Sequence, residues 1–531
     1  MNNKATRAER DTTGAAAPTG RAGTAGLPTV HQVDRLRSKG RLQEAREACL
    51  RLVDANPQFA RAVFLLGIIE QQMGNSEKSV ELMRRTIELQ PDFADAHVNL
   101  GVAYRSLNKI KSAEKAIREG LALEPNRADS HSILGAILEH AGKWIAAENA
   151  YRHALTLNPN HARTFNNLGV LMARQERNVE AEEAYRRALE IRPGYVDARF
   201  NLSTVHRYFP GDPEIEALKS ALGMDGLLDI QRTKMKFALG KAHDAIGDYA
   251  TAFEYFRQGN AEMARRGSVD EDAYRRRMEG VRAIFESRPV LSATPPPKSE
   301  HIPIFIVGPS RSGKTLIESL LTRGAESFRA GERRDLVEAE SETARRYSLN
   351  SRFPAYLEKL DAGMLSEIGE SYLKKVAALE PDARSSVNTL PGHYAHVGVI
   401  VESLPRAKVI FCRRNAMDCC MRIFFHYYRS RNEHTYDQES VARYYARYWG
   451  LLDFWKARYG EHVLEVRYEE LVSRPDATVP AIFDFCGLDD APAADTLDFR
   501  TDEIDHWRHY EAELQPMVKT LGQVAPGAAP R

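Results

Sequence analysis

Cysteine is scarce in this chain, and long apolar runs are missing. Five cysteines occur in 531 residues, and none of them forms a C-x-x-C pair. This usage excludes the disulfide framework of a small secreted protein and gives no sign of a structural zinc site. No apolar run approaches the roughly 18 residues that a membrane-spanning helix needs. We therefore expect a cytoplasmic protein without a membrane span and without a metal.

Neither sign of charge is in excess. The chain carries 74 Lys and Arg against 73 Asp and Glu, a formal net charge of +1. This balance argues against a nucleic-acid partner, which would need a broad basic surface, and is compatible with a local anion site. The apolar fraction of 43% and the charged fraction of 28% are typical of a globular protein, and the length predicts more than one domain.

Prolines and glycines recur with one strict period in the first part of the chain. The prolines stand 34 residues apart at Pro57, Pro91, Pro125, Pro159 and Pro193. Glycines that each follow a leucine keep the same period, at Gly67, Gly101, Gly135 and Gly169. The pattern resembles the tetratricopeptide repeat, a pair of antiparallel helices. It implies an α-solenoid over residues 30–211 whose concave face binds a protein or peptide. A copy out of register, with Gly240 and Phe256, extends the repeat-like helices over 212–285.

Composition also marks the ends and one boundary of the predicted domains. Residues 1–29 are rich in Ala, Gly, Thr and Arg and lack the apolar core of a signal peptide, so we expect a disordered tail there and another at 521–531. Residues 286–300 are rich in Pro and Ser, which favours a linker or an extended wrap between domains.

A different pattern begins after that boundary and predicts an α/β domain over residues 301–520. The apolar run Ile302–Gly308 leads into "GPSRSGKT" and then into a helical stretch. Strand, glycine-rich loop and helix in this order are typical of a phosphate-binding site. Two later apolar runs, Ala407–Arg413 and His462–Tyr468, alternate with helical stretches and predict a parallel sheet.

The loop itself admits a nucleotide-binding interpretation. Gly308, Gly313, Lys314 and Thr315 match G-x-x-x-x-G-K-[ST], the motif in which the lysine reaches phosphates and the hydroxyl holds magnesium. A P-loop kinase or ATPase also needs an acidic metal ligand at the end of a second strand. The second apolar run ends in Arg413 and Arg414 instead, which counts against this interpretation.

Five segments, in order, are similar to sulfotransferases of the tyrosylprotein type. They are "FIVGPSRSGKTLIESLL", which resembles the 5′-phosphosulfate loop, "FRAGERRDL", "VNTLPGHYAHVGVI", "AKVIFCRRNAMDCCMRIFF", which resembles the 3′-phosphate segment, and "VLEVRYEELVSRPDATVPAIFDFCGL". With the repeats, the chain resembles bacterial proteins that fuse tetratricopeptide repeats to a sulfotransferase domain. The resemblance implies transfer of a sulfuryl group from 3′-phosphoadenosine 5′-phosphosulfate to an acceptor hydroxyl, with a protein or peptide tyrosine as the favoured acceptor.

The resemblance also assigns the anion-binding residues. The loop that meets the 5′-phosphosulfate comprises Arg311, Ser312, Gly313, Lys314 and Thr315. Its backbone N–H groups, at a helix N-terminus, suit the charge that grows on the leaving phosphate. Five arginines and one acid, Asp418, lie between Arg413 and Arg431, and we assign the 3′-phosphate to Arg414 and Arg422. Five arginines cannot all reach one phosphate, so some should be ordinary surface residues.

Glu332 matches the glutamate that serves as base in the tyrosylprotein type, with Arg311 and Lys314 as its catalytic partners. The alternatives are that Glu332 only pairs with a neighbouring arginine, or that His393 or His396 is the base. Several residues depart from the family pattern: Ser310, Lys314, Thr389, Arg422 and Glu503. Lys314 could supply the charge that Thr389 lacks. A scaffold with a decayed sulfotransferase domain is the remaining hypothesis.

Overall fold

The computed structural model describes residues 27–267, 270–324, 326–349, 352–428, 435–489, 491–492, 504–525 and 527. The chain divides into two compact units, the first ending at Val205 and the second beginning at His206. Glu503, one of the predicted departures, lies outside the described residues, as do Arg429 and Arg431. Within the described part of the chain, no helix is both long and apolar enough to cross a membrane.

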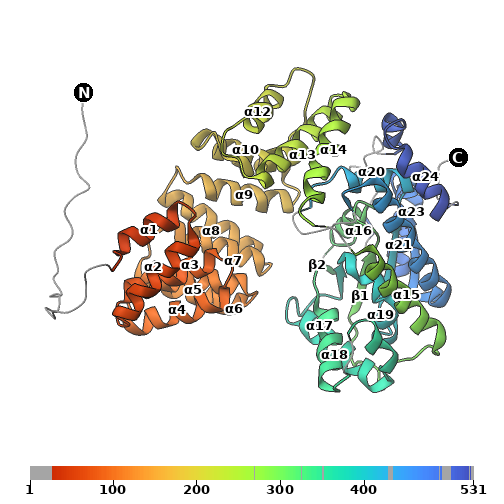
Figure 1. Cartoon of the computed structure of the whole chain (residues 1–531). Helices are drawn as coiled ribbons and strands as arrows, with labels where there is room; N and C mark the ends of the chain where they lie inside the picture. The colour runs from red at the N-terminus through yellow and green to blue at the C-terminus, as the bar shows by residue number, and fades with distance from the viewer. Residues whose placement is uncertain are drawn as a thin grey trace. The chain divides into compact units, whose positions relative to one another are not determined.

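The first unit is a stack of antiparallel helix pairs (Figure 1). Its helices α1 to α11 span Val30–Ser38, Leu42–Ala55, Ala60–Gln72, Ser76–Leu89, Ala94–Ser106, Ile110–Leu123, Ala128–His140, Trp144–Leu157, Ala162–Arg174, Asn178–Ile191 and Val196–Val205. The periodic glycines let the paired helices approach closely: a Cβ on Gly135 of α7 would lie 2.6 Å from the Tyr151 ring of α8. The predicted α-solenoid is confirmed.

The second unit begins with four helices, α12 to α15, which span Pro213–Leu222, Asp229–Ala245, Tyr249–Ala264 and Glu271–Ser287. Helices α13 and α14 repeat the packing of the solenoid pairs, since a Cβ on Gly240 would lie 2.7 Å from the Phe256 ring. The repeat-like copy that the sequence indicates out of register is therefore a helix pair of the same kind.

The rest of the second unit is built on a five-stranded parallel sheet in the order β2-β3-β1-β4-β5. Strands β1 to β5 span Ile302–Val307, Ser327–Gly331, Ser385–Asn388, Lys408–Arg413 and Val463–Arg467. Every residue of the central strand β1 is buried, as its unbroken apolar run predicts. The predicted fold class, a helical repeat domain followed by an α/β domain with a parallel sheet, is confirmed.

Helices α16 to α24 accompany the sheet. They span Lys314–Leu321, Asp335–Arg346, Ala362–Ala377, Val397–Ser403, Ala416–Phe424, Gln438–Arg458, Tyr468–Ser473, Pro475–Cys486 and Gln515–Val524. One apolar core joins the face of the sheet to α16 and α23, with Ile304, Ile410 and Ile482 fully or almost fully buried. This core fixes the strand ends, where the loops that carry polar side chains begin.

The Pro- and Ser-rich segment 286–300 lies along the α/β part of the second unit. The Ala293 N–H donates to the Glu402 carbonyl (2.9 Å), and the Thr294 N–H donates to the Ala362 carbonyl (3.0 Å). Arg288 pairs with the buried Glu402 carboxylate. Of the two forms that its composition favours, the segment takes the extended wrap. The predicted domain limits stay a prediction, which truncation can test.

Candidate active site

A pocket of about 1070 Å³ lies at the carboxyl edge of the parallel sheet. The chain that follows each strand contributes to its lining: the loop after β1, Glu332 after β2, Leu390 after β3, Arg414 after β4 and Tyr468 after β5. Parallel strands bring their carboxyl ends to one edge, and ligands of open α/β sheets bind there. The predicted site residues therefore meet, although up to 111 residues separate Arg311 from Arg422 in the sequence.

The loop between β1 and α16 is a tight turn in which two residues adopt the left-handed backbone conformation. Arg311 and Gly313 have φ values of 66° and 101°. A Cβ on Gly313 would lie 2.5 Å from the Tyr468 ring, and one on Gly308 would lie 2.4 Å from Ser312 Oγ. The turn directs the N-terminus of α16, with its unpaired N–H groups, toward the pocket.

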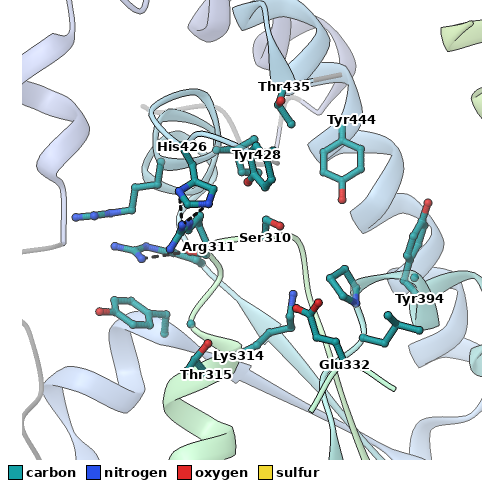
Figure 2. Close-up of a pocket in the computed structure, with 18 of the residues that line it drawn as sticks. Ser310, Arg311, Lys314, Thr315, Glu332, Tyr394, His426, Tyr428, Thr435 and Tyr444 are labelled. Atoms are coloured by element: carbon teal, nitrogen blue, oxygen red, sulfur yellow. Dashed lines mark hydrogen bonds between the residues drawn. The ribbon is translucent and has the colours of Figure 1, made fainter. Parts of the chain in front are cut away.

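Lys314 is buried at the base of this turn and lines the pocket. Its Nζ donates to the carbonyls of Gly308 (2.8 Å) and Pro309 (3.2 Å). Burial lowers the pKa of Lys314, and the charge of Glu332 opposes this effect. Figure 2 shows the Lys314 ammonium and the Glu332 carboxylate directed toward one another. Both groups line the pocket.

Arg311 is positioned by His426, a residue that the sequence does not predict to belong to the site. Its guanidinium contacts the imidazole of His426, with 2.7 Å between Nη2 and Nε2 (Figure 2). Burial and the neighbouring Arg311 charge lower the pKa of His426 to about 2, so the ring is neutral and accepts the hydrogen bond. No motif marks His426, because the contact joins residues 115 positions apart.

The arginines at and after the end of β4 lie in different environments, and only some of them line the pocket. Arg414 is buried, donates to the Arg311 carbonyl (3.3 Å) and lies 4.2 Å from the centre of the Tyr468 ring. Arg422 lines the same pocket from α20. Arg413 is absent from the lining: it pairs with Asp453 (2.6 Å) and lies over the Trp449 ring. Arg413 is therefore one of the ordinary surface arginines.

Asp418 belongs to the framework of the site. Its carboxylate is fully buried and accepts hydrogen bonds from the backbone N–H groups of Asp505 (2.8 Å) and Trp507 (3.0 Å). Burial raises its pKa. The residue ties the chain near the C-terminus to α20, and it is not part of the pocket lining.

The three candidate bases occupy different environments. Glu332 is exposed in the pocket and makes no hydrogen bond or ion pair with any described residue, while the adjacent Arg333 pairs with Asp335. His393 is fully buried outside the lining, and burial lowers its pKa to about 3, which removes it from the candidates. His396 lines the pocket and is bonded to the buried Glu340.

The remaining predicted residues lie in or beneath the loop. Ser310 and Thr315 line the pocket, and Ser312 is buried below it with no hydrogen-bond partner for its Oγ among the described residues. Thr389 is buried, and its N–H donates to the Gly331 carbonyl (3.0 Å). Thr389 does not line the pocket, so its side chain and that of Lys314 occupy different environments.

Tyrosines form a second wall that no motif indicates. Tyr274 of α15, Tyr394 and Tyr444 all line the pocket, and Figure 2 shows Tyr394 and Tyr444 on the side away from Arg311. The Tyr274 and Tyr394 hydroxyls are hydrogen-bonded to each other. The rings of Tyr394 and Tyr448 stack at 4.1 Å. Because Tyr274 precedes β1, the pocket is completed by a helix from outside the predicted α/β domain.

Comparison with protein families agrees with this division of the chain. Residues 303–492 match the model of the sulfotransferase family, and residues 64–128 and 126–194 match two tetratricopeptide repeat models. The chain combines tetratricopeptide repeats with a sulfotransferase-family domain. The pocket lies within that domain except for the contribution of Tyr274.

Similar proteins resemble parts of the chain. An uncharacterised protein of Aquifex aeolicus (strain VF5) is 22% identical over 338 residues, which are 59% of this chain and 44% of that protein. The chain thus spans less than half the length of this curated relative. Among solved structures, TTC0263, a thermophilic TPR protein of Thermus thermophilus, is 21% identical with a TM-score of 0.32 and covers 33% of this chain and 96% of its own. YrrB, a TPR protein with an unusual peptide-binding site, is 20% identical with a TM-score of 0.27, and the match covers 39% of this chain and 97% of YrrB.

Proposed function

We propose that this chain is a sulfotransferase that moves a sulfuryl group from 3′-phosphoadenosine 5′-phosphosulfate to an acceptor hydroxyl, and that the acceptor is a tyrosine of a protein or peptide. The family match of residues 303–492 supports the reaction class. The observation that carries the proposal is the pocket at the sheet edge, in which the loop, the predicted base and the predicted 3′-phosphate arginines meet.

The charges of the pocket fit a donor with two separate anionic groups. Its described lining contains one carboxylate, Glu332, and a set of basic side chains, namely Arg311, Lys314, Arg334, Arg414 and Arg422. The hydroxyls of Ser310 and Thr315 line the same pocket and add hydrogen-bond donors to it. A cluster of this kind concentrates an anionic ligand even though the whole chain is nearly neutral.

Each part of the site has a role in this proposal. The bound donor supplies the activated sulfuryl group. The N–H groups at the start of α16, with Lys314 and Arg311, offset the negative charge that grows on the leaving phosphate. Arg414 and Arg422 hold the 3′-phosphate through charge-assisted hydrogen bonds. Glu332, which faces Lys314, takes the proton of the acceptor hydroxyl.

The tyrosine wall supports an aromatic acceptor. The rings of Tyr274, Tyr394 and Tyr444 offer apolar faces and edges against which a phenol can pack. The tetratricopeptide repeats suit the protein part of such an acceptor, which we propose to bind on their concave face. The proposed location is the cytoplasm, where the five buried free cysteines would stay reduced.

A thermal-shift comparison tests the donor. Adenosine 3′,5′-bisphosphate, the product form of the donor, should stabilise the chain more than Mg-ATP at equal concentration. The two strands next to β1 favour this outcome. Strand β4 ends in Arg413 and is followed by Arg414, and β3 is followed by Thr389. A magnesium nucleotide site needs an acidic residue at such a position. A preference for Mg-ATP would overturn the proposal in favour of a P-loop nucleotide enzyme.

A matched pair of variants tests the site. Arg311→Ala should weaken bisphosphate binding by about 2 kcal/mol, or about thirtyfold, because one charge-assisted contact is lost. Arg413→Ala, which removes a neighbouring arginine directed outside the pocket, should leave the affinity within about twofold of wild type. Equal losses in the two variants, measured by titration calorimetry, would contradict the assignment of the loop.

A further inference from the structure

A carboxylate that the proposed reaction does not use lies directly behind the pocket wall. Glu340 of α17 is fully buried. It accepts a hydrogen bond from the Tyr356 hydroxyl (2.5 Å), and its other oxygen lies 2.8 Å from Nδ1 of His396. A buried carboxylate is costly unless it is hydrogen-bonded or paired with a cation. Among the described residues, the basic side chain within ion-pair distance of Glu340 is His396.

His396 connects this buried carboxylate to the pocket. It stands just before α19 and lines the pocket, and the Phe353 ring lies 4.7 Å from its centre. Since an ionised carboxylate only accepts hydrogen bonds, Nδ1 of His396 carries its hydrogen and donates the hydrogen bond to Glu340. Nε2 then carries the lone pair, and it makes no hydrogen bond within the described chain. The imidazole is thus held in one tautomer with its basic nitrogen available to a ligand.

We propose that His396, oriented by Glu340, can take the proton of the acceptor hydroxyl in place of Glu332, an inference that rests on the proposed function. As the acceptor oxygen forms its bond to sulfur, its O–H bond breaks and the proton moves to Nε2 of His396. The bond between sulfur and the bridging oxygen of the donor breaks, and its electron pair stays on the leaving phosphate. The imidazolium that results is stabilised by the Glu340 carboxylate, as in other base–carboxylate pairs.

The orientation of His396 distinguishes it from Glu332. The Glu332 carboxylate faces the Lys314 ammonium, and it makes no hydrogen bond with any described residue. The His396 ring is fixed by Glu340 on one side and by Phe353 on another. A general base acts only within hydrogen-bond reach of the proton, so an imidazole that is held in place by a hydrogen bond is well suited to this role.

Several ionisable groups surround His396 and bear on its pH dependence. Glu340 comes from α17, with Tyr356 behind it in the 3₁₀ turn Ala355–Lys359. His393 comes from the 3₁₀ turn that precedes α19, and it is uncharged near neutral pH because burial lowers its pKa to about 3. Arg334 and Glu332 face the same pocket. His396 and Glu332 are therefore the two groups in this set that can exchange a proton with a ligand in the pocket.

Chemical rescue tests the role of His396 in the full-length protein. With the phosphosulfate donor and a synthetic tyrosine peptide, His396→Ala should lower kcat by about a hundredfold or more, which is the usual size of a base contribution. Added imidazole should restore part of kcat, while Glu332→Gln should gain nothing from imidazole. The affinity for adenosine 3′,5′-bisphosphate should stay within about twofold of wild type in His396→Ala, because the residue acts on the acceptor.

Two further variants separate proton transfer from a structural effect. His396→Gln keeps a polar contact to Glu340 and should still lose the acidic limb of the kcat/KM pH profile. Glu340→Gln should lower kcat with little change in KM, as expected of a positioning residue. If the wild type is active, two results would overturn this role alone. The first is a set of His396 variants that keep the wild-type kcat. The second is a loss of kcat without imidazole rescue and with an unchanged pH profile. A wild type that binds the bisphosphate but transfers no sulfate would overturn the proposed function as well.

Discussion

At the residue scale, the charge of the Lys314 ammonium depends on its buried surroundings. Lys314 is buried, and its two hydrogen bonds go to the carbonyls of Gly308 and Pro309. A carbonyl offsets the lost hydration of an ammonium only in part, which is why burial lowers the pKa of Lys314. The Glu332 charge and a bound phosphate both act in the opposite direction.

The lowered pKa predicts an alkaline limit to anion binding. Lys314 is charged below its folded-state pKa and neutral above it, so bisphosphate affinity should fall as the pH rises through that value. Because the pKa is lowered, the fall should begin at a lower pH than for an ordinary lysine with a pKa of about 10.4. Titration calorimetry between pH 6 and 10 measures the effect. Lys314→Met should bind more weakly at neutral pH and lose this fall, and an equal pH dependence in both proteins would refute the prediction.

At the element scale, the helix pair α13–α14 supports the segment that carries Arg422 and His426. The Phe256 ring stacks on Phe425 at 4.0 Å, and Asn260 Nδ2 donates to the Phe424 carbonyl (2.7 Å). Asp244 of α13 accepts hydrogen bonds from His506 (2.8 Å) and Tyr510. The repeat-like helices are therefore part of the support of the anion pocket.

This support predicts a remote effect on binding. Asn260→Ala leaves the buried Phe424 carbonyl without the hydrogen bond from Asn260, so the free energy of unfolding should fall by about 1–2 kcal/mol. Bisphosphate affinity should fall with it, because His426 holds Arg311. Arg257→Ala on the same helix removes an exposed pair with Glu254 and should change stability by no more than about 0.5 kcal/mol. Urea denaturation and calorimetry measure both, and an unaltered affinity in a destabilised Asn260→Ala would contradict the link.

At the scale of the whole molecule, the compact unit that holds the site begins well before the sheet. Phe285 of α15 is fully buried, packs edge-on against Trp455 at 4.9 Å, and fills the space beside Gly398, where a Cβ would lie 2.3 Å from its ring. Arg288 then pairs with the buried Glu402. Removing these groups would expose apolar surface and leave a buried carboxylate without its cation.

Truncation tests this grouping. A fragment of residues 206–531 should unfold cooperatively and bind the bisphosphate as the full chain does, since it retains one whole compact unit. A fragment of residues 301–531 should be unstable or insoluble, because it lacks Phe285, Arg288 and Tyr274. Thermal melts followed by circular dichroism compare them. A well-folded 301–531 fragment with full affinity would instead support the domain limit at 286–300.

The sequence by itself determined the features that depend on local spacing. A 34-residue period in Pro and Gly predicts helix pairs that stack on their neighbours, because each repeat must bury the same face. The β1 loop follows from a buried apolar run joined to small residues and a helix, all within one short segment. Arg414 was also predictable, since it follows a strand whose carboxyl end must share an edge with the others.

Only the tertiary structure decided which distant side chains complete the site. Arg413 and Arg414 are adjacent, yet one lies on Trp449 outside the pocket and the other under the loop, because neighbouring residues of an extended chain point to opposite sides. Packing between elements brings His426, Tyr274 and His396 to the pocket lining and Glu340 behind His396, over separations at which sequence spacing carries no information. Packing between elements, rather than any local motif, therefore selects the positioning residues and the alternative proton acceptor that we propose.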